Sequence, residues 1–465
     1  MSDLLAEAIG LVGYATQTSG VGGIIKARVT DFRVEEIATP VHLDNRGRFT
    51  VAKVTLTNWE TNRFCNQLAA ILRIPRNRIF FAGTKDKRAV TSQLFVIDAP
   101  INKVADVELP DVEIEVLGRT HQKIGFGNHR GNRFTVVVRG CCDRDGRPLT
   151  DAEALNEVER ITTAMETSLG QNRFPNWIGP QRFGSGRPVT PYVGREVVRG
   201  DFEAAVMTYL SMEGDNEEDE AASIRRSIRE DGISEGFLVE TMPRWMGFER
   251  KMIEHLLAHP DDHIGAFRQL PNNLQLMTVH ALQSIVFNKS LQRRIEAGLP
   301  LAAPVEGDIV GRVDEKGQLD VNSCIVVEPR TLSRITRNCE LGRLMTTGPL
   351  PGSDISTSEG KPGELEQATI DAEGLADTTW EIDAIPRLST KGTRRGLVAH
   401  FDEFSVDTVP LADAQTMGKR WENGPQEGER WHPDGACLRF RFTLGSGSYA
   451  TVLLREFIQG PLANM

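Results

Sequence analysis

A single carboxylate stands among cations at Asp86, in a turn between two apolar segments. The chain reads Ile79-Phe80-Phe81-Ala82-Gly83-Thr84-Lys85-Asp86-Lys87-Arg88-Ala89-Val90 at this place. Nearby positive charges favour the ionised form of a carboxyl group. Asp86 is therefore a candidate nucleophile or general base, and the cations Lys85, Lys87 and Arg88 would attract a polyanion towards it.

Two other interpretations of this segment have to be weighed. A solvated hairpin tip without any function would have the same composition, and the segment by itself does not separate that interpretation from an active site. A phosphate-binding loop is suggested by Gly83-Thr84-Lys85. The first glycine of that pattern and its Lys-Ser/Thr ending are absent, and no helix signal follows, which argues against it.

Charge is distributed unevenly along the chain of 465 residues, a length that predicts two or three domains. The formal net charge is −10, which argues against indiscriminate binding of nucleic acid. However, residues 61–95 hold seven cations and Asp86 as the one acid, and residues 118–140 hold five cations and no acid. The sequence therefore predicts a local basic surface on an acidic protein.

Cysteine, histidine and hydropathy patterns exclude several classes of protein. The six cysteines form no Cys-x-x-Cys pair and no signal peptide precedes them, which predicts reduced thiols in a cytoplasm. His255 and His259 have helical spacing but no third ligand nearby, so we expect no metal. No apolar run approaches the roughly 20 residues that span a bilayer, so we expect a soluble protein without a membrane partner.

Local patterns predict the main elements. Alternating residues predict strands over 133–138 and 438–444, and helical spacing predicts helices over 274–295 and 449–458. Thr57-Asn58-Trp59-Glu60 matches a capping box and predicts a helix that begins there. We expect a solvated loop at 213–220 and a long surface excursion at 353–373. Composition alone places soft domain boundaries near 170 and 400.

Four further segments combine aromatic, amide and cationic groups, a mixture that suits stacking on unpaired bases and contacts with phosphate. Each also has a plain interpretation, as a turn or as a core aromatic. The segments are Lys26 with Asp31-Phe32, Gly131-Asn132-Arg133-Phe134, Phe174-Pro175-Asn176-Trp177-Ile178-Gly179-Pro180-Gln181-Arg182-Phe183-Gly184, and Gly447-Ser448-Tyr449-Ala450-Thr451.

Taken together and in this order, the motifs resemble the TruD-type tRNA pseudouridine synthases from Lys26 to Glu456. The most specific match is 81–93, which fits the family's Gly-x-Lys-Asp-x-x-Ala-x-Thr-x-Gln signature. The segment from about 173 to 399 is similar in length to that of the archaeal and eukaryotic branch of the family. Tyr449 is a departure, because the best-known bacterial members carry Phe there. Agreement of four motifs in order lowers the weight of the hairpin-tip interpretation.

The resemblance implies an isomerase that converts uridine to pseudouridine in tRNA, usually at position 13, without a cofactor and without a metal. It implies a catalytic role for Asp86 as nucleophile or as base, the choice being open. It implies uridine binding by Phe32, Asn132, Phe134, Tyr449 and Lys26, and we expect RNA contacts from Lys85, Lys87, Arg88 and Arg182. Which of the nearby cations pairs with Asp86 is open.

The resemblance also implies a mixed α/β (α+β) fold, with a largely antiparallel mixed sheet and an inserted α/β domain. The expected division is 1–172 and 400–465 for the catalytic domain and 173–399 for the insertion. We expect a cytoplasmic monomer. Two other functions were considered: an RNA-binding protein without activity, against which the complete signature around Asp86 argues, and a cofactor-dependent RNA methyltransferase. A glycine-rich nucleoside loop after a strand, which the second would need, is not convincing anywhere in the chain.

Overall fold

Two β-sheets organise the part of the chain that the computed structural model describes, residues 4–184, 187–214, 217–233, 242–315 and 317–465. The larger sheet contains β1 Gly22–Ile24, β2 Phe32–Ala38, β3 Phe49–Thr57, β4 Ile79–Phe81, β5 Val90–Ile97, β6 Val112–Thr120, β7 His129–Cys141, β8 Arg173–Pro175, β13 Val398–Val409 and β14 Cys437–Gly445. The smaller sheet contains β9 Ile309–Val313, β10 Leu319–Val326, β11 Leu344–Leu350 and β12 Thr393–Gly396.

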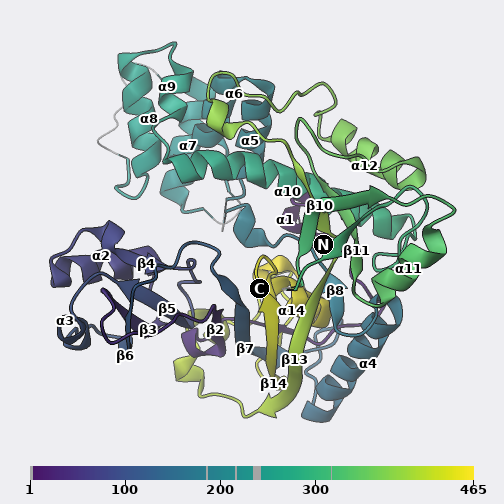
Figure 1. Cartoon of the computed structure of the whole chain (residues 1–465), viewed down its shortest axis with the longest axis horizontal. Helices are drawn as coiled ribbons and strands as arrows, with labels where there is room; N and C mark the ends of the chain where they lie inside the picture. Colours follow the sequence, from purple (N-terminus) through teal and green to yellow (C-terminus); the bar gives the residue numbers. More distant parts are fainter. Residues whose placement is uncertain (1–3, 185–186, 215–216, 234–241, 316) are drawn as a thin grey trace.

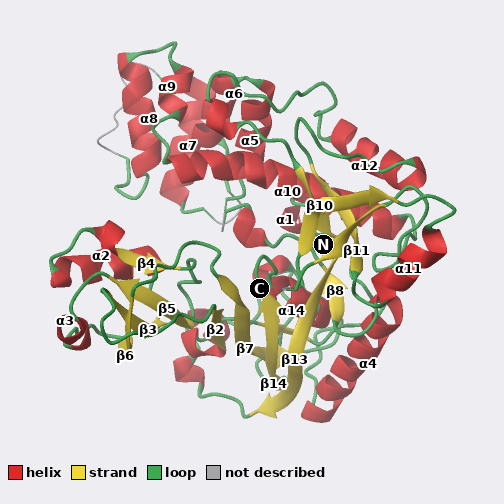
Figure 2. Ribbon diagram, viewed as in Figure 1, coloured by secondary structure: helices red, strands yellow, loops and turns green. Residues whose placement is uncertain are grey.

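Helices accompany both sheets (Figure 2). The helices from the two ends of the chain are α1 Leu4–Ala8, α2 Thr61–Leu72, α3 Ile101–Ala105, α4 Asp151–Leu169, α13 Lys419–Glu422 and α14 Ala450–Ile458. The helices from the middle of the chain are α5 Thr190–Arg199, α6 Phe202–Ser211, α7 Asp219–Asp231, α8 Gly247–Ala258, α9 His263–Phe267, α10 Asn272–Glu296, α11 Leu332–Glu340 and α12 Gly360–Ala372. In Figure 1, α5 to α9 gather at one end of the molecule, above the strands β2 to β6.

The larger sheet joins the two ends of the chain. Its strand order is β6-β3-β5-β2-β7-β14-β13-β8, with β1 paired to β7 and β4 paired to β5. The β2–β5 pair is parallel and the other pairs are antiparallel. Strand β14 pairs with β7 from Leu438↔Val138 to Gly445↔Gly131. The expected mixed α/β fold with a largely antiparallel sheet is confirmed.

The middle segment of the chain, between β8 and β13, begins and ends at two strands that pair with each other. Strand β8 pairs with the start of β13, with Val398 opposite Pro175 and His400 opposite Arg173. Between these strands lie α5 to α12 and the smaller sheet. We propose the discontinuous division expected from the sequence, with both edges shifted slightly so that β8 and the first residues of β13 belong to the larger sheet.

Apolar residues that alternate along the strands form the hydrophobic core. Phe440, Phe442 and Leu444 are buried on β14, in one cluster with Phe134 of β7 and Leu453 of α14. A second cluster lies among α5 to α10, and a third packs α2 against β3, β4 and β5. The strands expected over 133–138 and 438–444 and the helices expected over 274–295 and 449–458 are therefore confirmed.

Three local predictions were wrong in part. Helix α2 begins at Thr61, and its cap is the carboxylate of Glu60, which accepts hydrogen bonds from the backbone N–H groups of Asn62 and Arg63. Thr57 instead ends β3, where ladder pairing outweighs a cap. The excursion at 353–373 contains α12. In the stretch 213–220, residues 215–216 lie outside the described residues, and Asp219 already begins α7.

No helix in the described part of the chain is long and apolar enough to cross a membrane.

A buried asparagine on α10 links the middle segment to the N-terminal residues of the chain. Asn288 on α10 donates to the carbonyls of Ile9 and Ile178, both at 3.0 Å, and accepts from the N–H of Ile178 at 2.9 Å. Because buried backbone groups need partners, this amide fixes the segment that follows Trp177. That segment leads to Gln181, which lies beside Asp86.

A buried carboxyl group near the same place gives the fold a dependence on pH. Glu456 on α14 accepts a hydrogen bond from the N–H of Ala15 at 2.7 Å and is completely buried. Burial raises the pKa of Glu456 to about 7, although Arg455 acts in the opposite direction. A raised carboxyl pKa means that the folded chain holds a proton that the unfolded chain has already lost, between the unfolded pKa of 4.5 and about 7.

We predict that Glu456→Gln removes this pH dependence. Ionisation of Glu456 should destabilise the wild-type chain as the pH rises from 4.5 to about 7, whereas the neutral amide of the variant cannot ionise. The free energy of unfolding of the variant relative to wild type should therefore rise by as much as about 3 kcal/mol across that range. Urea unfolding at several pH values measures it, and a difference that is the same at every pH would contradict the assignment.

Candidate active site

The loop between β4 and β5 carries Asp86 and is held at both ends. The strand β4 pairs with the far part of β5, and the chain returns at Val90 beside Arg33 of β2. Within the loop, the N–H of Lys85 donates to the hydroxyl of Thr61 at 3.1 Å. The expected turn between two apolar strands is therefore present, and it lies next to the first residue of α2.

Lys26 is the cation whose ammonium group forms an ion pair with Asp86. Its Nζ lies 3.6 Å from Oδ2 of Asp86, and the side chains are 18% and 38% exposed. The same ammonium lies 4.5 Å from the ring centroid of Phe32. The backbone of Lys26 has φ 57°, which is uncommon for a residue other than glycine. Arg88 supports this backbone, because its guanidinium donates to the carbonyls of Lys26 and Ala27 at 2.9 and 3.0 Å.

Lys85 points away from the surface. Its ammonium donates to Oε2 of Glu36 at 2.8 Å, and the two side chains are only 7% and 1% exposed. The other carboxylate oxygen of Glu36 accepts from the N–H of Leu94 at 3.3 Å. The structure thus does not favour the expected RNA contact from Lys85, because its charge is already neutralised inside the protein. Lys87, by contrast, is exposed.

One face of the larger sheet forms the floor below this loop. Side chains alternate along a strand, so Phe32, Val34 and Glu36 of β2 share a face. The register places Val34 opposite Phe134 and Glu36 opposite Asn132 on β7. The rings of Phe32 and Phe134 are 6.2 Å apart in an edge-to-face arrangement. Two phenylalanine rings, the amide of Asn132 and the carboxylate of Glu36 therefore lie on one face of the neighbouring strands β2 and β7.

A cavity of about 230 Å³ lies between the floor and the loop. It receives five of the residues expected to act on the substrate: Asp86, Phe32, Asn132, Phe134 and Tyr449. The amide oxygen of Asn132 is buried and has no hydrogen-bond partner among the described residues. Since an unpaired buried acceptor is costly, this oxygen is suited to receive an N–H donor from a bound molecule.

Tyr449 enters the cavity from the opposite end of the chain. It precedes α14 and is half-buried. A Cβ atom at Gly179 would lie 2.8 Å from Oε1 of Gln181 and 3.0 Å from the Tyr449 ring, so a larger residue there would force both side chains to shift. The segment after Trp177 therefore packs directly against Tyr449.

Gln181 and Thr451 also line the cavity, although neither was singled out from the sequence. The amide of Gln181 donates to the hydroxyl of Thr451 at 3.3 Å. Both belong to motifs that carried the resemblance, so their presence in those motifs was an available signal. Arg182, which was singled out, is half-buried and is not one of the residues that line the cavity.

Two neighbouring hollows extend the cavity. Asp86 and Gln181 also line a cavity of about 220 Å³, to which Lys26 contributes. On another side, Ser448 lines both the small cavity and a cleft of about 680 Å³ between the smaller sheet and the end of β14. Asp86 therefore lies at a junction rather than at the bottom of a closed pocket.

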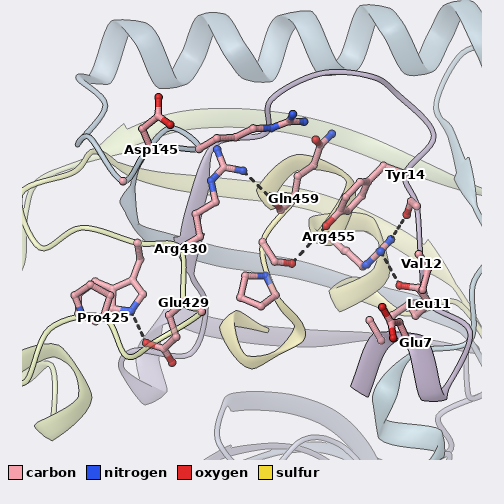
Figure 3. A pocket seen from close by; sticks show the side chains of 18 of the residues that line it. Glu7, Leu11, Val12, Tyr14, Asp145, Pro425, Glu429, Arg430, Arg455 and Gln459 are labelled. Carbon is pink, nitrogen blue, oxygen red and sulfur yellow. Dashed lines mark hydrogen bonds between the residues drawn. The ribbon is translucent and has the colours of Figure 1, made fainter. Parts of the chain in front are cut away.

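A cavity of about 650 Å³ at the chain ends is larger but poorly suited to bind a ligand (Figure 3). Its arginines already donate to backbone carbonyls. Arg455 donates to Leu11 and Gly13, and Arg430 donates to Ser19, Gly20 and Cys142. These guanidinium groups tie the N-terminal segment to the end of the chain, which is a structural role.

Metal-binding groups do not gather in the described part of the chain, where no group of three His, Cys, Asp or Glu side chains could hold an ion. His255, one of the two histidines considered from the sequence, lies 2.9 Å from Oδ2 of Asp262.

Comparisons with known proteins agree along almost the entire chain. The family model for tRNA pseudouridine synthase D (TruD) matches residues 8–457. A Methanosarcina mazei protein named "Probable tRNA pseudouridine synthase D" is 35% identical over 457 residues, covering 98% of this chain and 97% of the relative. A Halobacterium salinarum protein of the same name is 34% identical over 470 residues, covering 99% of this chain and 98% of the relative.

The same family is found among solved structures. A crystal structure described as that of the "Putative tRNA pseudouridine synthase D (TruD) from Methanosarcina mazei" matches with a TM-score of 0.81 and 33% sequence identity, covering 99% of each chain. With agreement of sequence, family model and fold over the full length, this chain belongs to the tRNA pseudouridine synthase D (TruD) family, whose members isomerise uridine to pseudouridine in tRNA.

Proposed function

We propose that Asp86 is the catalytic carboxylate with which this chain isomerises uridine in tRNA, and that the target is the uridine at position 13. The observation that carries the proposal is the cavity in which Asp86 meets two phenylalanines and an unpaired amide oxygen. A carboxylate beside a small, partly apolar hollow suits a reaction on one extruded base. The family's usual target supports the choice of position.

The isomerisation exchanges one bond to the sugar for another. The bond between C1′ of the ribose and N1 of the uracil breaks, the base turns, and C1′ joins C5. A proton leaves C5 and N1 gains one, so atoms and electrons balance without an oxidant or a cofactor. Asp86 acts either as a nucleophile or as a base that removes a sugar proton, and both roles begin from the carboxylate.

The remaining cavity residues would hold the base while it is detached. The target must leave its stack, which costs a few kcal/mol, and contact with Phe32, Phe134 and Tyr449 offsets that cost. The amide oxygen of Asn132 accepts a hydrogen bond from the uracil N3–H. This donor stays in place during the reaction, because bonds change only at N1 and C5 of the base. Lys26 orients the carboxylate through its contact with Asp86.

Different groups would bind the rest of the tRNA. Lys87 is exposed at the loop tip, and Arg182 lies half-buried beyond the cavity, so both are proposed to contact phosphates. Arg88 is also exposed but donates to the carbonyls of Lys26 and Ala27, so we assign it a positioning role in addition.

We propose that the protein acts as a monomer in the cytoplasm, as expected from the sequence. The six cysteines are free thiols, which fits the reducing cytoplasm where tRNA is modified.

We predict that Asp86→Asn abolishes turnover while keeping the fold. Removing the charge should lower the rate by at least about 10²- to 10⁴-fold. Release of tritium from C5-labelled uridine at position 13 measures the rate, and a transcript with cytidine at that position tests the choice of target. Asp106→Asn, an exposed carboxylate beyond α3, is the matched control and should retain wild-type turnover. Substantial turnover by Asp86→Asn would refute the assignment.

The pair formed by Glu36 and Lys85 gives a second prediction, because its neighbour in sequence provides a control. Glu36→Gln leaves the Lys85 ammonium buried without a counter-ion and should cost about 3–5 kcal/mol of stability. Glu35 pairs with Lys53 at the surface, so Glu35→Gln should cost less than about 1 kcal/mol.

At a temperature where every variant is folded, Glu36→Gln should also lower kcat at least about tenfold, because a displaced Asp86 would lose about 1.4 kcal/mol or more of transition-state stabilisation. KM for tRNA should change much less, because the charge of Lys85 is paired with Glu36 inside the protein. A folded Glu36→Gln variant with wild-type kcat would show that the pair only stabilises the fold.

A further inference from the structure

An exposed aromatic side chain lies beside the Asp86 loop and has no role in the cavity. Phe126, in the connection between β6 and β7, is 75% exposed, the largest exposed fraction among the large apolar side chains recorded for the described residues. Single exposed apolar residues are ordinary on protein surfaces. Phe126 is distinguished by its surroundings.

The backbone holds Phe126 next to the Asp86 loop. The N–H of Gly127 donates to the carbonyl of Ala82 at 2.8 Å, four residues before Asp86. The flanking Gly125 and Gly127 have open space where a Cβ would lie, and Gly127 has φ +80°, which favours glycine. A tight, uncrowded loop thus presents the ring to solvent.

Only one part of the Phe126 ring contacts the protein. The nearest ring is Phe81, at 5.4 Å between centroids and 59° between planes. Phe81 is itself buried, with the guanidinium of Arg76 5.2 Å from its ring centroid. Since three quarters of Phe126 stays in water, covering Phe81 accounts for little of its surface.

Cations without acids flank Phe126 in the sequence. Residues 118–140 contain no Asp or Glu. Lys123 is exposed, with its ammonium 5.0 Å from the Phe80 ring centroid, and Arg130 is exposed with no ion pair among the described residues. Arg130 also lines the large cleft that meets the small cavity at Ser448.

We propose that Phe126 is a stacking platform for an unpaired base of the tRNA, outside the cavity that takes the target uridine. Aromatic side chains set among cations bind single-stranded RNA by stacking on bases while the cations hold the phosphates. Arg76, whose guanidinium lies beside the neighbouring ring of Phe81, and the exposed Lys123 and Arg130 on either side of Phe126 in the sequence would supply that charge. The platform holds a nucleotide near the target while the target itself is extruded, and it rests on the proposed function.

Substitutions at this one position test the proposal. Phe126→Ala should weaken tRNA binding about 5- to 150-fold, the range expected for loss of one stacked base. Phe126→Trp should restore binding, whereas Phe126→Leu should bind as poorly as Phe126→Ala, because leucine keeps apolar surface but loses the ring. The salt dependence of binding should not change, since stacking releases no counter-ions.

Further measurements locate the base and control for the fold. Transcripts with 2-aminopurine at single unpaired positions near the target should show quenching at one position with wild type and not with Phe126→Leu. Leu117→Ala, at a 41% exposed position on β6, is the control and should bind tRNA as wild type does. Thermal midpoints verify that each variant is folded.

The outcomes separate this proposal from the function on which it rests. Wild-type binding by Phe126→Leu, or no loss in Phe126→Ala, would overturn the platform while pseudouridine formation by the wild-type protein still stands. Failure of the wild-type protein to form pseudouridine would overturn the proposed function instead, whatever the binding of the variants.

Discussion

The buried ion pair between Lys85 and Glu36 is the interaction on which the arrangement of the site depends. It fastens the residue directly before Asp86 to the floor of the larger sheet, in a place that water barely reaches. A charge buried in this way must keep its partner, so the loop has one position relative to β2. With Lys85 neutralised internally, Lys26 becomes the cation that faces Asp86.

Pairing of strands from distant parts of the chain supplies the remaining groups. Strand β7 lies between β2 and β14, which brings Phe32, Asn132 and Phe134 to one face and places Tyr449 at its edge. Asn288 holds the segment that leads to Gln181. The cavity beside Asp86 is therefore assembled from the N-terminal strands, the start of the middle segment and the last helix, and loosening any of these contacts would misplace the others.

Much of this site could be predicted from the sequence, because alternation marks β7 and β14 and because four motifs keep their order. Local patterns could not reveal what Lys85 does. Among adjacent cations it is indistinguishable from Lys87, and its partner Glu36 lies 49 residues earlier. The position of Glu36 on the same face as Asn132 follows only from the register of β2 with β7. The cap of α2 was misassigned for a related reason, since pairing in the sheet decided where Thr57 belongs.

The most direct test of this account is a position-resolved map of pseudouridine in a tRNA transcript incubated with the purified wild-type protein, in buffer with a chelator and no added nucleotide or cofactor. We expect a new pseudouridine at position 13, formed in an amount that approaches that of the tRNA. Absence of pseudouridine, or its formation only after a cofactor is supplied, would contradict a mechanism in which the Asp86 carboxylate and its cavity suffice.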